Sequence, residues 1–197
     1  MSGVLFENKV LCEFKKYFHE GVFIASGRVA RTLCGDFLMS LYCTEPIGRS
    51  IAIEQRSDDP DSFSRDEWRD AMVVGDRCVD AVYRVGRLNF ERHMEDVLYA
   101  LSILEPDFFC ERKKAGLKEL ASIEVIASLK ESDSDMHFFK YKNDSDSGGF
   151  YFERRDNLVK YKRDFGRNAY EFASSVGGGD LDAIIQSFRQ ENNVSGG

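Results

Sequence analysis

The sequence predicts an α+β protein: a mainly helical N-terminal two-thirds packed on a small C-terminal antiparallel β-meander, with a short terminal helix. Apolar residues recur at helical spacing through much of the first 130 residues. From residue 131 onward, short aromatic segments alternate with clusters of turn-forming residues. We therefore expect a helical part at 1–130 and a sheet part of the same domain at 131–176. A hinge, a short helix and a loose tail are expected at 177–197.

Four helices are expected in the N-terminal part. Ser64 and Glu67 have the spacing of a capping box, which is the clearest helix-start signal in the chain. Gly21 and Gly86 suit the position just after a helix, and the residue before Pro106 disfavours helical backbone. These signals place the helices at about residues 6–20, 28–42, 65–85 and 89–105.

Three further features complete the N-terminal part. Asn89 is expected to cap the fourth helix, and the run Ile51-Ala52-Ile53 reads as a brief strand. Residues 107–129 fit a helix, but the stretch from Ile123 to Leu129 also fits a strand, so this segment stays open.

The C-terminal sheet is expected from three short segments rich in aromatic residues, at 137–142, 150–154 and 158–162. Alternation along the first segment places Phe139 and Tyr141 on one face, and Phe138, Lys140 and Lys142 on the other. Asp180 is expected to cap the final helix.

Composition limits the classes of protein that the chain can be. It has 197 residues and a net charge of −7, so general binding to polyanions is disfavoured. No stretch is apolar enough for a membrane helix, and no secretory signal is apparent. The five cysteines show neither disulfide-framework nor metal-knuckle spacing. These features favour the reducing cytoplasm and no membrane partner.

Catalytic and metal motifs are not recognisable. The Asp144 loop begins like a calcium loop but has Arg155 where a bidentate glutamate is needed. The three histidines lack zinc-ligand spacing. A cysteine–histidine pair could form on folding, and His137 is the histidine we would name because it opens an aromatic strand. We therefore expect neither a metal nor a cofactor, and no catalytic residue is assigned.

The functional hypothesis that follows is a non-enzymatic, acidic protein-binding module. In its most concrete form it is an inhibitor or immunity-type protein, as in toxin–antitoxin-like pairs, that occludes a partner with a basic surface. Trp68 would serve as an anchor if it is exposed. The expected contacts are Glu54, Asp58, Asp59, Asp61, Asp66 and Trp68.

The alternative is an RNA- or nucleotide-directed factor or enzyme. Residues 137–172 contain eight basic and six acidic residues, a local charge of +2, among ten aromatic residues. Aromatic, basic sheets can stack bases and follow phosphates. The residues expected to bind are His137, Lys140, Lys142, Arg154, Lys160 and Lys162. A structural adaptor role, the oligomeric state and processing at Gly196-Gly197 stay open.

Overall fold

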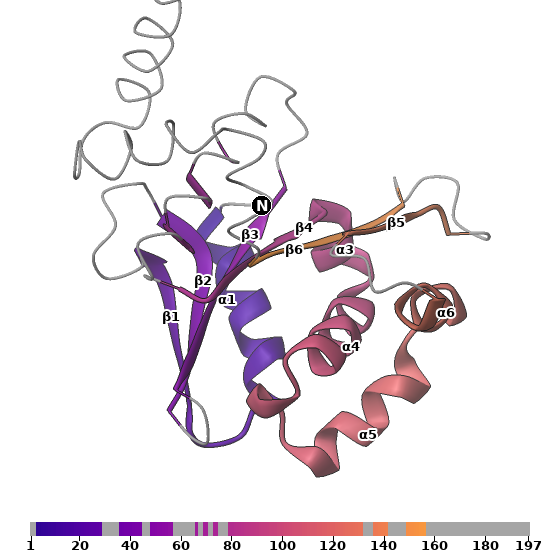
Figure 1. The fold of residues 1–197 in the computed structure, drawn as a ribbon, viewed down its shortest axis with the longest axis horizontal. Coiled ribbons are helices and arrows are strands. Elements are labelled where there is room, and N and C mark those ends of the chain that lie inside the picture. Colours follow the sequence, from indigo (N-terminus) through magenta and orange to yellow (C-terminus); the bar gives the residue numbers. More distant parts are fainter. Residues whose placement is uncertain are drawn as a thin grey trace, which may run out of the picture.

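A mixed sheet, with six strands in the part of the chain that the structure describes, organises the protein (Figure 1). The computed structural model describes residues 3–28, 36–44, 48–56, 66, 69–70, 73–74, 79–131, 136–141 and 149–156. In chain order the elements are α1 (Gly3–Lys15), β1 (Val22–Arg28), β2 (Asp36–Cys43), β3 (Arg49–Gln55), β4 (Ala81–Val85), α3 (Arg87–Arg92), α4 (Met94–Leu104), the 3₁₀ helix η1 (Pro106–Phe108), α5 (Glu111–Leu120), α6 (Ile123–Glu131), β5 (Met136–Phe139) and β6 (Phe150–Arg155).

The strands lie in the order β1-β2-β3-β4-β6-β5. All neighbours are antiparallel except β3 and β4, which run parallel. A parallel pair needs a crossover connection. Between these two strands, residues 66, 69–70 and 73–74 are helical, and Val73 and Val74 pack on Ala52 and Val82.

The predicted fold class is wrong. Four of the six strands come from the N-terminal half, and the helices α3 to α6 follow in the middle of the chain. The C-terminal hairpin of β5 and β6 joins the same sheet through β4. A helical N-terminal two-thirds packed on a small C-terminal antiparallel meander is therefore not the architecture of this protein.

The predicted helix at 28–42 is wrong because β1 ends at Arg28 and β2 begins at Asp36. Met39, Leu41 and Cys43 are buried, whereas Ser40 and Tyr42 between them are not. This is the two-residue period of a strand. The apolar residues are dense enough here to satisfy a helical period as well, so periodicity alone chose the wrong element.

The predicted helix at 65–85 is correct only near its start. The described residues between 66 and 74 are helical, but Ala81–Val85 forms β4. All five residues of β4 are buried. A strand covered on both faces has no alternation of apolar and polar residues, so a short apolar run cannot be distinguished from a buried helix.

Other expectations are confirmed in outline. A first helix and a strand containing residues 51–53 are present as α1 and β3. The fourth helix is divided into α3 and α4 by His93, and the open segment 107–129 is mainly helical, forming α5 and most of α6. Segments 158–162 and 180–188 lie outside the described residues.

Asn89 is not the cap that the sequence predicts. It lies buried inside α3, where its amide accepts a hydrogen bond from the Tyr151 N–H at 3.0 Å and donates one to the Gly149 carbonyl at 3.1 Å. The side chain therefore ties α3 to β6.

The main core lies on one face of the sheet, which we call the inner face. There α1 and α4 supply Phe14, Val97 and Leu101, which belong to the same buried cluster as Ile53 and Tyr83 of the strands. Figure 1 shows α1 and the helices α3 to α6 on this side. No helix among the described residues is long and apolar enough to cross a membrane.

Buried polar contacts join the helices to the sheet. Glu105, just after α4, accepts two hydrogen bonds from Arg49 at 2.5 and 2.6 Å and one from the Tyr83 hydroxyl at 2.7 Å. Burial and the adjacent Glu105 raise the pKa of Tyr83 well above its ordinary value. Tyr83 therefore stays a neutral donor, and the end of α4 is held against β3 and β4.

Candidate functional site

The opposite face of the sheet, the outer face, carries a cluster of charged side chains. It receives alternate residues of β4 and β6, because the neighbouring residues Tyr83 and Phe152 point into the inner core. Arg84 is paired with Glu153 in the strand register. Strand alternation thus brings charges from separate parts of the sequence to one surface.

Arg84 is held by acidic groups on both sides. Its Nε and Nη2 donate to the two carboxylate oxygens of Asp70 at 2.8 and 2.6 Å. Its Nη1 donates to Asp66 at 3.1 Å. Burial acts to lower the pKa of Arg84, but these carboxylates outweigh it and hold that pKa above its ordinary value.

Asp70 also joins Arg84 to Arg155. The Arg155 guanidinium donates to Asp70 at 2.6 Å and to Glu153 at 2.7 Å. A buried carboxylate is tolerated when charged donors surround it. Asp70 therefore links the helical residues near position 70 to both β4 and β6.

Glu54 and Asp66, two of the predicted partner contacts, belong to this cluster. Arg69 lies 3.5 Å from a Glu54 oxygen and 3.6 Å from an Asp66 oxygen. Burial raises the pKa of Glu54, and Arg69 opposes that rise. Both carboxylates therefore face arginines of the same chain. The other predicted contacts, Asp58, Asp59, Asp61 and Trp68, lie outside the described residues.

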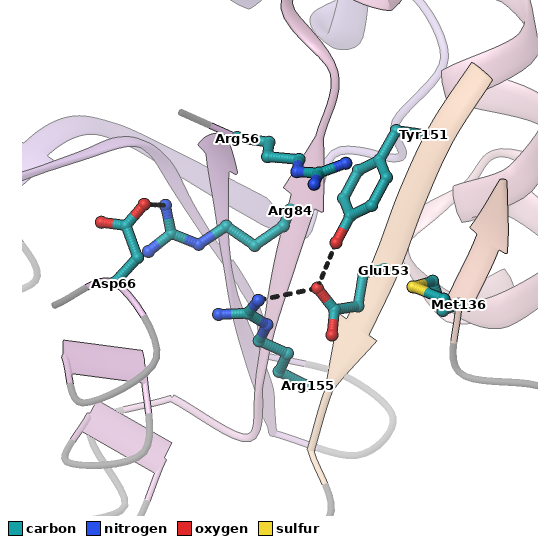
Figure 2. A pocket seen from close by; sticks show the side chains of 7 residues that line it. All are labelled: Arg56, Asp66, Arg84, Met136, Tyr151, Glu153 and Arg155. Carbon is teal, nitrogen blue, oxygen red and sulfur yellow. Dashed lines mark hydrogen bonds and ion pairs between the residues drawn. The ribbon is translucent and has the colours of Figure 1, made fainter. Parts of the chain in front are cut away.

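A cavity of about 190 Å³ opens beside the cluster. Figure 2 shows its wall, which is formed by Arg56, Asp66, Arg84, Met136, Tyr151, Glu153 and Arg155. The Arg56 guanidinium stacks 3.9 Å from the centre of the Tyr151 ring. Small-molecule sites usually enclose about 300–1,000 Å³, so this cavity fits a single side chain better than a metabolite.

Glu153 has one oxygen that accepts no hydrogen bond from a described residue. Its Oε2 accepts hydrogen bonds from the Tyr151 hydroxyl at 2.5 Å and from Arg155 at 2.7 Å (Figure 2). No described group donates to its Oε1. Burial and the neighbouring Glu153 raise the pKa of Tyr151, so this hydroxyl stays a donor. The wall of the cavity thus offers a further acceptor.

The described part of the charged cluster has four arginines and four carboxylates: Arg56, Arg69, Arg84 and Arg155 against Glu54, Asp66, Asp70 and Glu153. Of these, three arginines and two carboxylates line the cavity itself: Arg56, Arg84, Arg155, Asp66 and Glu153. The formal charges of the described cluster balance. The cluster therefore carries no large net charge of either sign. Its preference for a ligand depends on which of its hydrogen-bonding groups can still bond to that ligand.

A cysteine–histidine pair does form, but with His19 instead of His137. The Cys43 sulfur lies 3.3 Å from His19 Nε2. The Gly21 N–H donates to His19 Nδ1 at 2.9 Å, so Nε2 carries the proton and donates to the Asp107 carbonyl at 2.8 Å. His19 therefore has no nitrogen available to take a proton from the thiol. The separation of 24 positions gave no signal in the sequence.

The described residues of the alternative nucleic-acid set do not share one surface. His137 is only 3% exposed and its ring lies 2.9 Å from the Ser128 hydroxyl of α6. Arg154 forms an ion pair with Asp156, and its neighbours in the strand, Glu153 and Arg155, face the opposite side. Lys140 is exposed. Lys142, Lys160 and Lys162 lie outside the described residues.

Comparison of the chain with models of protein families, with curated proteins and with solved structures finds no match. Among the residues that the structure describes, no three histidine, cysteine, aspartate or glutamate side chains are grouped as metal ligands.

Proposed function

We propose that the chain is a non-enzymatic protein-binding module, most concretely an acidic inhibitor or immunity-type protein that occludes a partner with a basic surface. The observation that carries this proposal is the exposure of two large apolar side chains on the short strand β5. Met136 is 49% exposed and Phe138 is 58% exposed. Both lie on the outer face, next to the cavity.

The composition of this surface supports protein binding. Aromatic residues, methionine and arginine are enriched at protein interfaces. Here Phe138 packs against Tyr151 with ring centroids 6.4 Å apart, and Arg56 and Met136 line the adjoining cavity. We call the set Arg56, Met136, Phe138, Tyr151 and Glu153 the β5 surface.

The net charge of −7 supports a basic partner. An acidic surface speeds the approach of a basic protein and disfavours acidic competitors. Glu54 and Asp66 form ion pairs with arginines of the same chain. We therefore place the proposed partner contact on the β5 surface and not on these two residues.

A cytoplasmic location is part of the same proposal. Cys12, Cys43 and Cys110 carry thiols, with no disulfide among the described residues. Thiols of this kind are kept reduced in the cytoplasm.

A comparative pull-down tests the proposal. The tagged full chain, the double variant M136S/F138S and the control I123S are used as baits in lysate from the native source. Ile123 is 81% exposed on α6 and lies outside the β5 surface, so I123S removes an exposed apolar side chain elsewhere.

We expect one basic protein to be captured by the wild type and by I123S, and lost by M136S/F138S. Equal capture by all three baits would exclude the β5 surface as the binding site of the captured protein. An acidic partner would contradict the proposed charge complementarity. The purified pair is then measured by calorimetry to show that the contact is direct.

A further inference from the structure

We infer that β5 is a docking edge for an extended segment of the partner, and that the cavity beside it receives a lysine or arginine side chain from that segment. The inference rests on the proposed function as a protein-binding module. It adds the geometry of the contact and the chemistry of the residue that is recognised.

The position of β5 makes strand pairing possible. Among the strands that the structure describes, β5 is the last in the order β1-β2-β3-β4-β6-β5. An edge strand presents backbone donors and acceptors to another extended chain. Figure 1 places β5 at the end of the sheet, with α6 on the inner side, which is where His137 contacts Ser128.

The backbone directions in β5 follow from the contacts of β6. The Tyr151 N–H donates to Asn89 and the Tyr151 carbonyl accepts from the Gly86 N–H. Both backbone groups of Tyr151 therefore point away from β5. Phe138 lies opposite Tyr151.

Antiparallel strands alternate between hydrogen-bonded and non-hydrogen-bonded pairs. Phe138 and Tyr151 form a non-hydrogen-bonded pair, so the N–H and C=O of Phe138 point toward the outer edge. The same alternation directs the backbone of His137 and Phe139 toward β6. Phe138 thus offers a donor, an acceptor and an exposed ring at one position.

A strand added to β5 would place alternate side chains on the outer face. Adjacent strands lie about 4.8 Å apart. Met136 is directly opposite Glu153, so a long side chain from the added strand can cross Met136 and approach the Glu153 carboxylate. The aliphatic stem of a lysine or arginine packs well on apolar side chains of this kind.

The available hydrogen-bonding groups favour a basic side chain. Arg84 donates to Asp70, Asp66 and the Gln55 carbonyl. Arg155 donates to Asp70 and Glu153. At Arg84 and Arg155 an incoming anion would have to displace one of these carboxylates. An incoming donor can instead bond to Glu153 Oε1, which accepts from no residue in the described part of the chain.

The test uses synthetic blocked nonapeptides in which threonine and valine alternate around a central lysine. Matched peptides carry glutamate or methionine at the centre. Fluorescence anisotropy measures their binding to the full chain. We expect the lysine peptide to bind about tenfold more tightly than the glutamate peptide, and E153Q to remove most of that difference while the methionine peptide binds as before.

Backbone pairing is tested without changing the protein. Two versions of the lysine peptide are N-methylated at alternate residues. In one version the methyl groups block the backbone N–H groups along one edge of the extended peptide, and in the other version they block those along the opposite edge. We expect one of them to lose binding and the other to keep it, because only one peptide edge pairs with β5. Equal effects of the two methylation patterns would overturn strand pairing.

Two other results would overturn the inference: no binding of any nonapeptide, or a preference for the glutamate peptide or for a labelled single-stranded RNA. These results leave the proposed function standing if M136S/F138S still loses the captured protein in the pull-down. The opposite combination is a preference for the lysine peptide together with unchanged capture of the partner by M136S/F138S. It would support recognition of a basic side chain by the cavity and contradict the β5 surface as the binding site of the captured protein.

Discussion

Asp70 and Arg84 form a buried bidentate ion pair, with two hydrogen bonds of 2.6 and 2.8 Å. The Asp70 side chain is fully buried and the Arg84 side chain is only 2% exposed. This pair joins the helical residues near position 70 to the centre of the sheet, and it organises the charges that surround the cavity.

Removing the carboxylate of Asp70 should strongly destabilise the protein. D70A leaves two buried guanidinium groups, those of Arg84 and Arg155, without their shared acceptor. Breaking a buried pair in this way costs about 3–5 kcal/mol in the free energy of unfolding. Urea unfolding of the variant and the wild type measures the difference.

The matched control is K114A. It removes the Lys114–Glu111 pair, in which the Glu111 side chain is 81% exposed, and exposed pairs contribute little. A loss below about 1 kcal/mol for D70A would show that the cluster does not depend on this residue.

Glu54 should make stability depend on pH. Burial raises its pKa above the ordinary value of 4.5. The folded protein then holds a proton at Glu54 more tightly than the unfolded chain does. Its contribution to stability is therefore complete below the ordinary value and is lost as the pH rises through the raised value.

E54Q removes this loss. The free energy of unfolding of E54Q, measured relative to that of the wild type, should therefore rise as the pH increases from 4.5 upward. Urea unfolding at intervals from about pH 4 to about pH 8 gives the comparison. A constant difference across that range would contradict the expected sign.

Cys43 should be an unreactive thiol despite its contact with His19. It is completely buried, and the hydrogen bonds of His19 leave no nitrogen to accept its proton. Cys12 is exposed. Timed labelling with iodoacetamide, read by peptide mass spectrometry, should modify Cys12 at least about tenfold faster than Cys43.

Labelling after denaturation is the control, because both thiols should then react at similar rates. Fast reaction of Cys43 in the folded protein would instead indicate an activated nucleophile and would reopen an enzymatic interpretation.

Nucleic acid should bind poorly or not at all. His137 is buried and Arg154 is paired with Asp156, so two of the basic candidates do not offer a free positive surface. A gel-shift titration with single-stranded and double-stranded RNA at low salt should show no complex. A shift that weakens steeply with added salt would favour the nucleic-acid alternative.

The predictions of local structure succeeded where one face of an element is apolar and its end is marked. α1 and α4 show helical spacing of residues such as Phe14 and Leu101, and Pro106 marks the end of α4. β2 and β4 were missed for two different reasons. Dense apolar residues in β2 fit two periods, and β4 is covered on both faces.

The candidate site was only partly predictable. Glu54 and Asp66 stand out in an acidic stretch, but their partners Arg69 and Arg84 carry no signal of that pairing in the sequence. Sequence spacing does not reveal which charges meet across strands, because the register of β3, β4 and β6 sets those distances.

The sequence by itself determined the net charge, the positions of the thiols and several amphipathic elements, because these depend on composition and on neighbours along the chain. Only the tertiary structure decided that the acidic residues Glu54 and Asp66 pair with arginines of the same chain and that Phe138 lies exposed on an edge strand of the described sheet. The physical reason is that the strength of a charge pair and the exposure of a side chain depend on distance and burial in space, which the order of strands in the sheet establishes.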